Sequence, residues 1–397
     1  MADTIDISMA LDLPTQDVSM DVDRGWFIEQ PTQEKSIEIT ENGTVEVLPD
    51  DGYKLEKVNV NVNVQSENKN NATIDYSAYQ QGQYLYYSLS SIDLAGLDTS
   101  GNTNFKNMFY GMSGLKEIKN IKSLDTSNAT SFYYMFYGCK KLQNIDLSGL
   151  STSNVEEMVG MFYNCYNLET VNVYGFDTSK VIDMKWMFDY CEKLSTVDLS
   201  SFDTRNVKNM SNMFEYCYKL ENLDLSSFST ENVTTMEYMF NWCNKLKTVR
   251  LSKIKADNLT KMSYMFYQCS SLQEVDLSSL GESKLTTIAS MFYNCREIKR
   301  IDFGNLDTSL VTNMANAFVD CYKLETLTLG PNWASNSKIA TFDISDCTSL
   351  SHDSLVDIMN KLATRTNSPT IKLHANSKAL LTDVEKSIAT NKGWTIA

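Results

Sequence analysis

Nine cysteines are the residues of this 397-residue sequence with the most obvious chemistry. They recur every 26 residues, as Cys139, Cys165, Cys191, Cys217, Cys243, Cys269, Cys295, Cys321 and Cys347. Such thiols could form disulfides or bind a metal, but metal-binding cysteines usually come in close pairs such as Cys-x-x-Cys, and the sequence contains none. The alternative is a ladder of buried, reduced thiols that pack as small hydrophobic side chains. The odd number of cysteines favours this alternative, as does the expected folding of the chain in a cytoplasm.

The two histidines, His352 and His374, offer no catalytic arrangement, because two isolated imidazoles make neither a triad nor a metal cluster. The sequence also lacks a glycine-rich phosphate loop, a Gly-x-Ser-x-Gly motif and a His-Glu-x-x-His motif. We therefore predict a protein that is not an enzyme and that needs no cofactor and no metal.

A repeat must position the cysteines, and its clearest mark is a Met-Phe pair that ends three residues before most of them. The pair occurs at Met108-Phe109, Met135-Phe136, Met161-Phe162, Met187-Phe188, Met213-Phe214, Met239-Phe240, Met265-Phe266 and Met291-Phe292, and as Ala317-Phe318. The first step is 27 residues long and each later step is 26. A fixed period in this range is typical of a solenoid, in which each coil contacts only its neighbours.

Each coil combines two periodicities. Val197 and Leu199 alternate with polar residues, which predicts a short strand with one buried side. The segment before them repeats apolar residues at spacings of three and four, which predicts a helical segment: Val181, Met184, Met187, Phe188, Cys191 and Leu194. Residues such as Asp203 and Asn206 supply turns between the two. Stacked coils would place a parallel sheet on one face and helices on the other.

The outward position of each predicted strand is a candidate ligand-binding site. Coil by coil it holds Asp93, Lys119, Asp146, Asn172, Asp198, Asp224, Arg250, Asp276, Asp302 and Thr328. Adjacent strands lie about 4.8 Å apart, so stacked carboxylates would repel one another unless a cation or a basic partner compensates. One hypothesis is a site for a cation or basic ligand made by the seven Asp and Asn residues. The alternative is a solvated polar face, which the interruptions at Lys119 and Arg250 favour.

Aromatic residues beside the predicted helical segments form a second candidate surface. They are Tyr134, Trp186, Tyr238, Trp242 and Tyr264. The alternative interpretation is packing between successive coils, which we favour.

The overall charge bounds the possible partners. The chain has 50 Asp and Glu against 35 Lys and Arg, a net charge of -15. Such a field repels nucleic-acid phosphates and anionic lipid surfaces. No apolar run approaches the length of a membrane span, so membrane insertion is not expected. The first residues show neither a basic nor an apolar signal region, so we expect no secretory signal and synthesis in a cytoplasm.

The domain organisation follows from these patterns. We predict an N-terminal arm over residues 1–34, which a partner orders or which stays disordered, and a polar linker over 66–75. Between them, residues 35–65 alternate as strands around an Asn42-Gly43 hairpin signal and a second turn at Pro49–Gly52, which predicts a small β module. The solenoid spans 76–340, beginning with an aromatic-rich strand at 84–94.

Residues 341–397 read as an α/β cap for the C-terminal end. A helix over 351–363 capped by Ser351, a strand over 370–374 and a closing helix over 381–394 that ends at Gly393 would shield the core from water.

The repeat resembles that of the BspA-type leucine-rich-repeat surface-protein family. Asp177-Thr178-Ser179 followed by Val181-x-x-Met184-x-x-Met187-Phe188-x-x-Cys191 matches its pattern, and the resemblance covers about residues 85–340. It implies an α/β leucine-rich-repeat solenoid and a role in adhesion and ligand binding at a cell surface.

Two further segments resemble parts of virion proteins from phages of gut bacteria. They are the β module, with Ile39-Thr-Glu-Asn-Gly-Thr44, and the ending Thr390-Asn-Lys-Gly-Trp-Thr-Ile396. The resemblance implies a phage virion adhesion protein, found in the virion, that docks to other virion proteins through residues 1–65. Its solenoid would bind a host-surface or mucosal protein or glycan, and the protein could form a homo-oligomer. The alternative is a bacterial cell-surface adhesin; an intracellular scaffold is a third hypothesis.

Overall fold

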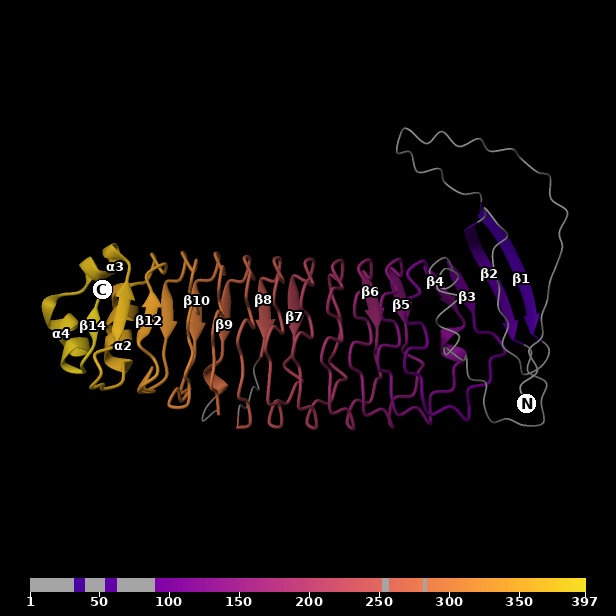
Figure 1. The fold of residues 1–397 in the computed structure, drawn as a ribbon, viewed down its shortest axis with the longest axis horizontal. Helices are drawn as coiled ribbons and strands as arrows, with labels where there is room; N and C mark the ends of the chain where they lie inside the picture. Colours follow the sequence, from indigo (N-terminus) through magenta and orange to yellow (C-terminus); the bar gives the residue numbers. More distant parts are fainter. Residues whose placement is uncertain (1–31, 40–53, 63–89, 252–256, 281–283) are drawn as a thin grey trace, which may run out of the picture.

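The computed structural model describes residues 32–39, 54–62, 90–251, 257–280 and 284–397. Coils of similar size stack along one axis into an elongated rod, with the C-terminal cap at one end and strands β1 and β2 at the other (Figure 1). The predicted α/β leucine-rich-repeat solenoid is therefore confirmed, because most of the described coils contribute one short parallel strand and successive coils contact one another.

One face of the rod carries three-residue parallel strands. They are β3 (Ser91–Asp93), β4 (Glu117–Lys119), β5 (Asn144–Asp146), β6 (Thr170–Asn172), β7 (Asn222–Asp224), β8 (Thr248–Arg250), β9 (Glu274–Asp276), β10 (Arg300–Asp302) and β11 (Thr326–Thr328). They pair as β3-β4, β5-β6, β7-β8 and β9-β10-β11, and the segment around Asp198 is not a strand. Two 3-10 turns, η2 (Ile121–Ser123) and η3 (Ser278–Leu280), follow β4 and β9.

The opposite face of the rod is made of tight turns and not of the predicted helical segments, so that prediction is wrong. Between Val181 and Leu194 the chain makes consecutive tight turns, and Trp186 and Tyr190 adopt left-handed backbone angles, with φ of 60° and 57°. The N–H of Trp186 donates to the carbonyl of Ser211 in the next coil at 3.1 Å. A left-handed residue every fourth position turns alternate N–H groups outward to the neighbouring coil, so the i→i−4 bonds of a helix cannot form. Tight turns thus produce the same spacing of apolar residues as a helix.

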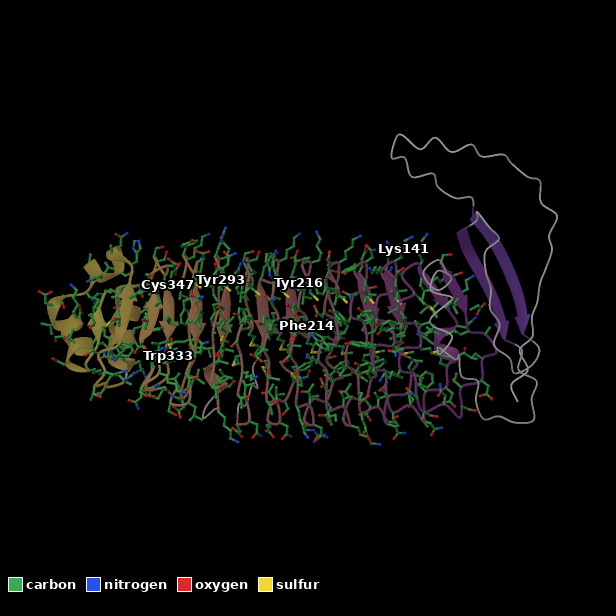
Figure 2. The ribbon with its side chains drawn as sticks, viewed as in Figure 1. Lys141, Phe214, Tyr216, Tyr293, Trp333 and Cys347 are labelled. Atoms are coloured by element: carbon green, nitrogen blue, oxygen red, sulfur yellow. The ribbon has the colours of Figure 1, made fainter. Side chains whose placement is uncertain are left out.

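The core between the two faces consists of stacked identical side chains. The phenylalanines of the Met-Phe pairs stack from Phe109 to Phe318 with ring centroids 5.2 to 6.0 Å apart and nearly parallel planes. Figure 2 places Phe214 of this stack inside the rod. All nine cysteines are buried free thiols, as predicted. Each thiol lies within 3.0 to 3.8 Å of the carbonyl oxygen of the phenylalanine one coil earlier.

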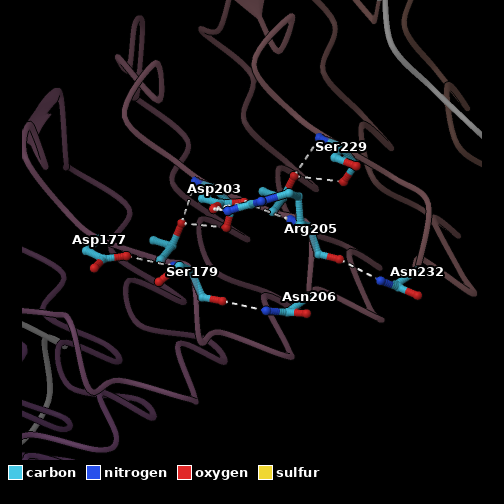
Figure 3. Close-up of polar contacts among 9 residues, drawn as sticks. Asp177, Ser179, Asp203, Arg205, Asn206, Ser229 and Asn232 are labelled. Atoms are coloured by element: carbon cyan, nitrogen blue, oxygen red, sulfur yellow. Dashed lines mark hydrogen bonds and ion pairs between the residues drawn. The ribbon is translucent and has the colours of Figure 1, made fainter.

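Polar residues of the Asp-Thr-Ser-Asn segment close one corner of each coil (Figure 3). The Asp177 carboxylate accepts from the N–H of Ser179 at 3.0 Å, which forms the turn. The buried Thr178 hydroxyl donates to the carbonyl of Asp203 at 2.9 Å and accepts from its N–H at 2.8 Å. The Asn206 amide donates to the carbonyl of Ser179 at 2.7 Å. Each coil therefore satisfies backbone groups of its neighbour at this corner.

Two parallel strands form the N-terminal unit, β1 (Thr32–Ile39) and β2 (Lys54–Val62), and β2 lies against β3. The predicted Asn42-Gly43 hairpin and Pro49–Gly52 turn lie outside the described residues, as does the linker over 66–75. Of the arm predicted over 1–34, residues 1–31 also lie outside them, and residues 32–34 begin β1. The aromatic-rich first strand over 84–94 is described only from Ser90, and its end forms β3.

The C-terminal cap contains a helix, a strand and a closing helix within the predicted ranges, and it adds two strands and a third helix. Strands β12 (Thr341–Ile344), β13 (Thr370–Leu373) and β14 (Thr395–Ile396) form a parallel sheet with helices α2 (His352–Lys361), α3 (Ala375–Leu380) and α4 (Asp383–Asn391). Of these elements, β12, α3 and β14 were not predicted. Ser351 caps α2, and Thr382 with Glu385 forms a capping box on α4. The hydroxyl of Ser354 in α2 accepts from the N–H of Leu327, so α2 covers the open edge of β11. No helix in the described ranges is long and apolar enough to span a bilayer.

The thiol ladder leads to a first prediction. In the native protein none of the nine cysteines should react with iodoacetamide, because each is buried and desolvation raises the pKa of thiols such as Cys191 and Cys217. In denaturant all nine should react. Mass spectrometry of both samples checks this, and a disulfide or bound zinc in the intact protein would contradict it.

The corner hydroxyls lead to a second prediction. Thr178→Val keeps the shape of a fully buried side chain but leaves the N–H and carbonyl of Asp203 without their hydroxyl partner. The free energy of unfolding should fall by about 2 kcal/mol. Urea unfolding followed by circular dichroism measures this change. Thr196→Val, on the exposed strand face, is the matched control and should change stability by less than about 0.5 kcal/mol.

Candidate functional site

The strand face carries the predicted ligand-binding residues, each at the end of its strand segment. The strand register sets these pairs side by side: Asp93 with Lys119, Asp146 with Asn172, Asp224 with Arg250, and Asp276 with Asp302. Asp198 lies in the segment that is not a strand. The structure therefore brings the seven residues together in short runs, and not in one continuous ladder.

All seven side chains have the same local role, which sequence reasoning missed. The Oδ1 atom of each accepts from the backbone N–H two residues later at 2.9 to 3.1 Å, in Asp93, Asp146, Asn172, Asp198, Asp224, Asp276 and Asp302. This is the hydrogen bond of an Asx turn, so each residue turns the chain at the end of its strand. Hydrogen bonds from Ser200 lower the pKa of Asp198, and bonds from Ser278 lower that of Asp276. Both carboxylates therefore stay ionised at neutral pH.

Cationic and amide side chains of the same or the next coil compensate several of these charges. Lys122 Nζ lies 2.5 Å from Asp146, and its hydrogen bond and charge help to lower the pKa of that carboxyl to about 2. Arg250 lies 3.5 Å from Asp224, and Arg300 lies 2.9 Å from Asp302. The repulsion expected in the stack is thus relieved within the chain. In the described ranges no three His, Cys, Asp or Glu side chains are grouped to hold a metal ion. Ligand binding at this face stays a prediction.

The turn face carries a second surface, which we call the aromatic ribbon. Its members are half-buried: Tyr110, Tyr133, Tyr134, Tyr137, Tyr163, Tyr166, Trp186, Tyr190, Tyr216, Tyr218, Tyr238, Trp242, Tyr264, Tyr267 and Tyr293. Rings of successive coils stack, with centroids 4.4 Å apart for Tyr110 and Tyr137 and 4.8 Å apart for Tyr267 and Tyr293. Figure 2 labels Tyr216 and Tyr293 toward the same long edge of the rod.

The ring geometry shows that the predicted packing between coils occurs, while part of every ring remains exposed. Where rings stack in parallel, their faces meet, and each ring keeps intermediate exposure. Lysines cover other faces: Lys185 Nζ lies 3.6 Å from the ring centroid of Trp186, and Lys106 Nζ lies 4.3 Å from that of Tyr133. The ribbon therefore presents partly exposed aromatic side chains, with lysine ammonium groups beside some of them, in a long row.

Backbone conformation explains where the predicted aromatic residues lie. Tyr134, Trp186, Tyr238 and Tyr264 all occupy the first left-handed position of their coils, and Trp242 occupies the second. Asn107, Gly160 and Asn212 hold the first position in other coils, as expected for residues that adopt positive φ readily. An aromatic side chain there costs about 1 kcal/mol of backbone strain. Asn and Gly recur at these two positions in the sequence, and this recurrence could have revealed the left-handed backbone there.

Three central coils bury polar groups beneath the ribbon, which sequence reasoning also missed. The residue after the stacked phenylalanine is tyrosine in most coils but Asp189, Glu215 and Asn241 in these three, with 2, 8 and 5% exposure. Asn241 Nδ2 donates to Glu215 at 2.5 Å, and Asn212 also donates to that carboxylate. Asp189 Oδ1 has no hydrogen-bond partner in the described part of the chain. Desolvation, with repulsion from Glu215, raises the pKa of Asp189 to about 9.

The histidines lie in the cap and have structural partners. His352 Nε2 lies 3.1 Å from Glu385, whose hydrogen bond raises the pKa of the imidazole. His374 Nδ1 accepts from the N–H of Asn376 at 3.2 Å and caps α3.

The buried carboxyl leads to a third prediction. Because its pKa is raised, Asp189 binds a proton in the folded protein that the unfolded chain releases near pH 4, so stability falls as pH rises from about 5 to 8. Asp189→Asn should remove a large part of this decline and stabilise the protein at pH 8 by about 2 kcal/mol or more. Thermal unfolding at several pH values measures this. Asp198→Asn, whose carboxyl has a lowered pKa, should leave the slope over this range unchanged.

Among solved structures, the chain is similar to a leucine-rich cell surface protein from Faecalibacterium prausnitzii A2-165, at 16% identity and a TM-score of 0.36 over 85% of this chain and 94% of that one. A leucine-rich repeat protein from Eubacterium ventriosum ATCC 27560 aligns at 15% identity and a TM-score of 0.30, over 69% and 79% of the two chains. The TLR13–ssRNA13 complex aligns at 16% identity and a TM-score of 0.23, over 80% and 54%. No curated protein matches the sequence.

A sequence family matches the repeats in three overlapping segments, residues 79–173, 143–248 and 221–333. Together they cover the solenoid coils and more than half of the chain. The chain therefore belongs to the family described as Mycoplasma protein of unknown function, DUF285.

Proposed function

We propose that this protein is a binding protein of the bacterial cell surface, an adhesin whose solenoid displays a surface for a protein or glycan. The aromatic ribbon is the observation that carries the proposal. Its rings are half-exposed and continue over coils from Tyr110 to Tyr293. Tyrosine and tryptophan combine apolar area with hydrogen-bonding groups and dominate many binding surfaces, and contiguous exposed patches of this kind mark interaction sites.

The way the structure uses its other polar residues supports a binding role without catalysis. The carboxylates of the strand face accept backbone hydrogen bonds at turns, and the corner threonines and asparagines bridge coils. These groups form hydrogen bonds that hold the fold together, whereas the rings of the ribbon stay partly exposed. A rigid rod that carries a row of aromatic side chains along its length suits the binding of extended ligands.

The virion role predicted from residues 1–65 stays a prediction, because most of that segment lies outside the described residues. The resemblance of the repeat to surface proteins favours the adhesin.

Quantitative mass spectrometry of the source culture gives a fourth prediction and separates the two locations. Peptides of this chain should be found in the cell-envelope fraction and should disappear when intact cells are treated with protease. Density-banded phage particles from the same culture should lack them. Peptides enriched in the particles at constant stoichiometry to the capsid protein would contradict the adhesin and support the virion role.

Binding by the purified full chain completes the test. The fluorescently labelled protein should bind saturably to a mucin-coated surface, and unlabelled protein should compete. Tyr137→Ser with Tyr163→Ser should weaken binding about tenfold, because these half-buried rings lie in the ribbon. Asp198→Asn with Asp276→Asn on the strand face is the control and should leave the affinity unchanged. An equal loss in both variants would contradict binding through the ribbon.

A further inference from the structure

The three central coils differ from the rest of the solenoid along one edge. Each places an aromatic residue one position before its cysteine and a lysine two positions after it. We call this set the central row; its members are Tyr190, Lys193, Tyr216, Lys219, Trp242 and Lys245. In other coils the position before the cysteine holds Gly138, Asn164, Gln268, Asn294 or Asp320.

The turn at each cysteine directs both side chains of the row away from the core. A hydrogen bond of 3.0 Å from the N–H of Leu194 to the carbonyl of Cys191 closes a four-residue turn around Lys193. The same bond recurs in the next two coils at 3.2 and 3.0 Å. The cysteine and leucine of each turn are buried and the lysine is exposed.

The lysines of the row lack the ion pairs that other lysines of the solenoid make. Lys122, Lys247 and Lys323 each lie within 2.8 Å of an acidic residue one coil away. Within the described residues, by contrast, no carboxylate lies within 4 Å of the three lysine ammonium groups of the row. The row has two acidic neighbours. The charge of the half-buried Glu192 acts on Tyr166 and Tyr218, and Glu221 pairs with Lys247 and also feels the charge of Lys245.

The row repeats the same positive charge in three successive coils. The stacked phenylalanine rings of these three coils lie 5.5 and 5.8 Å apart, which is the distance between successive coils. Like charges on these coils therefore recur at short spacing. The chain as a whole has a net charge of -15, which makes an exposed basic row exceptional in it. A ligand with regularly spaced negative charges would relieve the repulsion.

The aromatic members of the row favour a sugar as that ligand. Tyr190 and Tyr216 stack at 4.2 Å, and Trp242 continues the row at 6.3 Å from Tyr216. All three keep left-handed backbone angles, with φ of 57°, 57° and 62°, at a position where Asn or Gly would be less strained. Phenol hydroxyls and the indole can hydrogen-bond sugar hydroxyls, while ring carbons contact the apolar face of a pyranose.

We propose that the central row binds a linear acidic polysaccharide, with the lysines on its carboxylates and the aromatic residues on its sugar rings. This inference rests on the proposed adhesive function and names the class of its ligand. A densely charged polymer such as nucleic acid is disfavoured because the surrounding protein is strongly acidic. A glycan with one carboxylate per disaccharide is less densely charged and suffers less repulsion from the acidic chain.

Affinity electrophoresis of the full chain in gels containing hyaluronan tests the proposal. Hyaluronan should retard the protein, dextran should not, and added salt should weaken the retardation because exposed ion pairs are screened. The triple variant Lys193→Gln, Lys219→Gln, Lys245→Gln should bind hyaluronan about tenfold more weakly. The matched control changes the same number of exposed lysines elsewhere, Lys208→Gln, Lys299→Gln and Lys338→Gln, and should bind as the unmodified protein does.

Aromatic variants separate binding from folding. Tyr216→Asn with Trp242→Asn introduces a residue that occupies the same left-handed position in other coils, such as Asn164 and Asn294. The melting temperature should therefore stay the same or rise, while hyaluronan binding weakens several-fold.

Three results would overturn the inference. They are equal losses in the two lysine triples, unchanged binding in the aromatic variant, and stronger retardation by polyglutamate or oligo-dT than by hyaluronan and polygalacturonate. If no acidic glycan binds while the mucin assay stays positive, this inference fails and the proposed adhesin stands. If both assays are negative, the proposed function fails as well.

Discussion

Hydrogen bonding between successive coils is the constraint on which the rest of the structure depends. A coil of 26 residues contains too little regular structure to satisfy its own N–H and C=O groups, and burying them unpaired would be costly. The neighbouring coil supplies the partners: strand backbones on one face, the Trp186-to-Ser211 type of bond on the other, and the Thr178 and Asn206 side chains at the corner. In a solenoid built this way, only the first and last coils lack a neighbouring coil on one side. The α2 helix with Ser354 closes one end, and β2 lies against the first described coil at the other.

The features that could be predicted from the sequence are those in which one residue type recurs for one physical reason. Phe188 and Cys191 repeat because a stacked core admits the same volume in every coil, so the period, the buried thiols and the strand positions could all be predicted. The helical segments could not be excluded, because apolar spacings of three and four arise both from a helix and from tight turns. The deciding residues were the Asn and Gly at left-handed positions, such as Asn164 and Gly138. Their meaning depends on backbone angles that spacing does not reveal.

The candidate site also combines features that could be predicted from the sequence with features that could not. Asp198 and Asp276 were predicted at the right positions, but their turn-forming hydrogen bonds depend on how the chain bends after the strand. For Tyr134 and Tyr264 the favoured interpretation was packing between coils, and the ring contacts that they make became visible only with the coils assembled. Asp189 and Glu215 could not be recognised as buried, because the same position elsewhere holds half-exposed tyrosines. Burial of a polar group is a property of the packing around it, and packing between coils has no local signature in the sequence.

The equal spacing of the phenylalanine stack has a consequence for how such a protein can vary. Every coil meets its neighbours through the same contacts, so the gain or loss of one complete 26-residue unit leaves all interfaces of the same kind and both caps intact. The rod then lengthens or shortens by a single ring-to-ring step of 5.2 to 6.0 Å. Gene segments that encode such units can recombine out of register without destroying the fold. Duplication and deletion of whole units can therefore change the length of the rod, while the surface residues of the central coils stay the same.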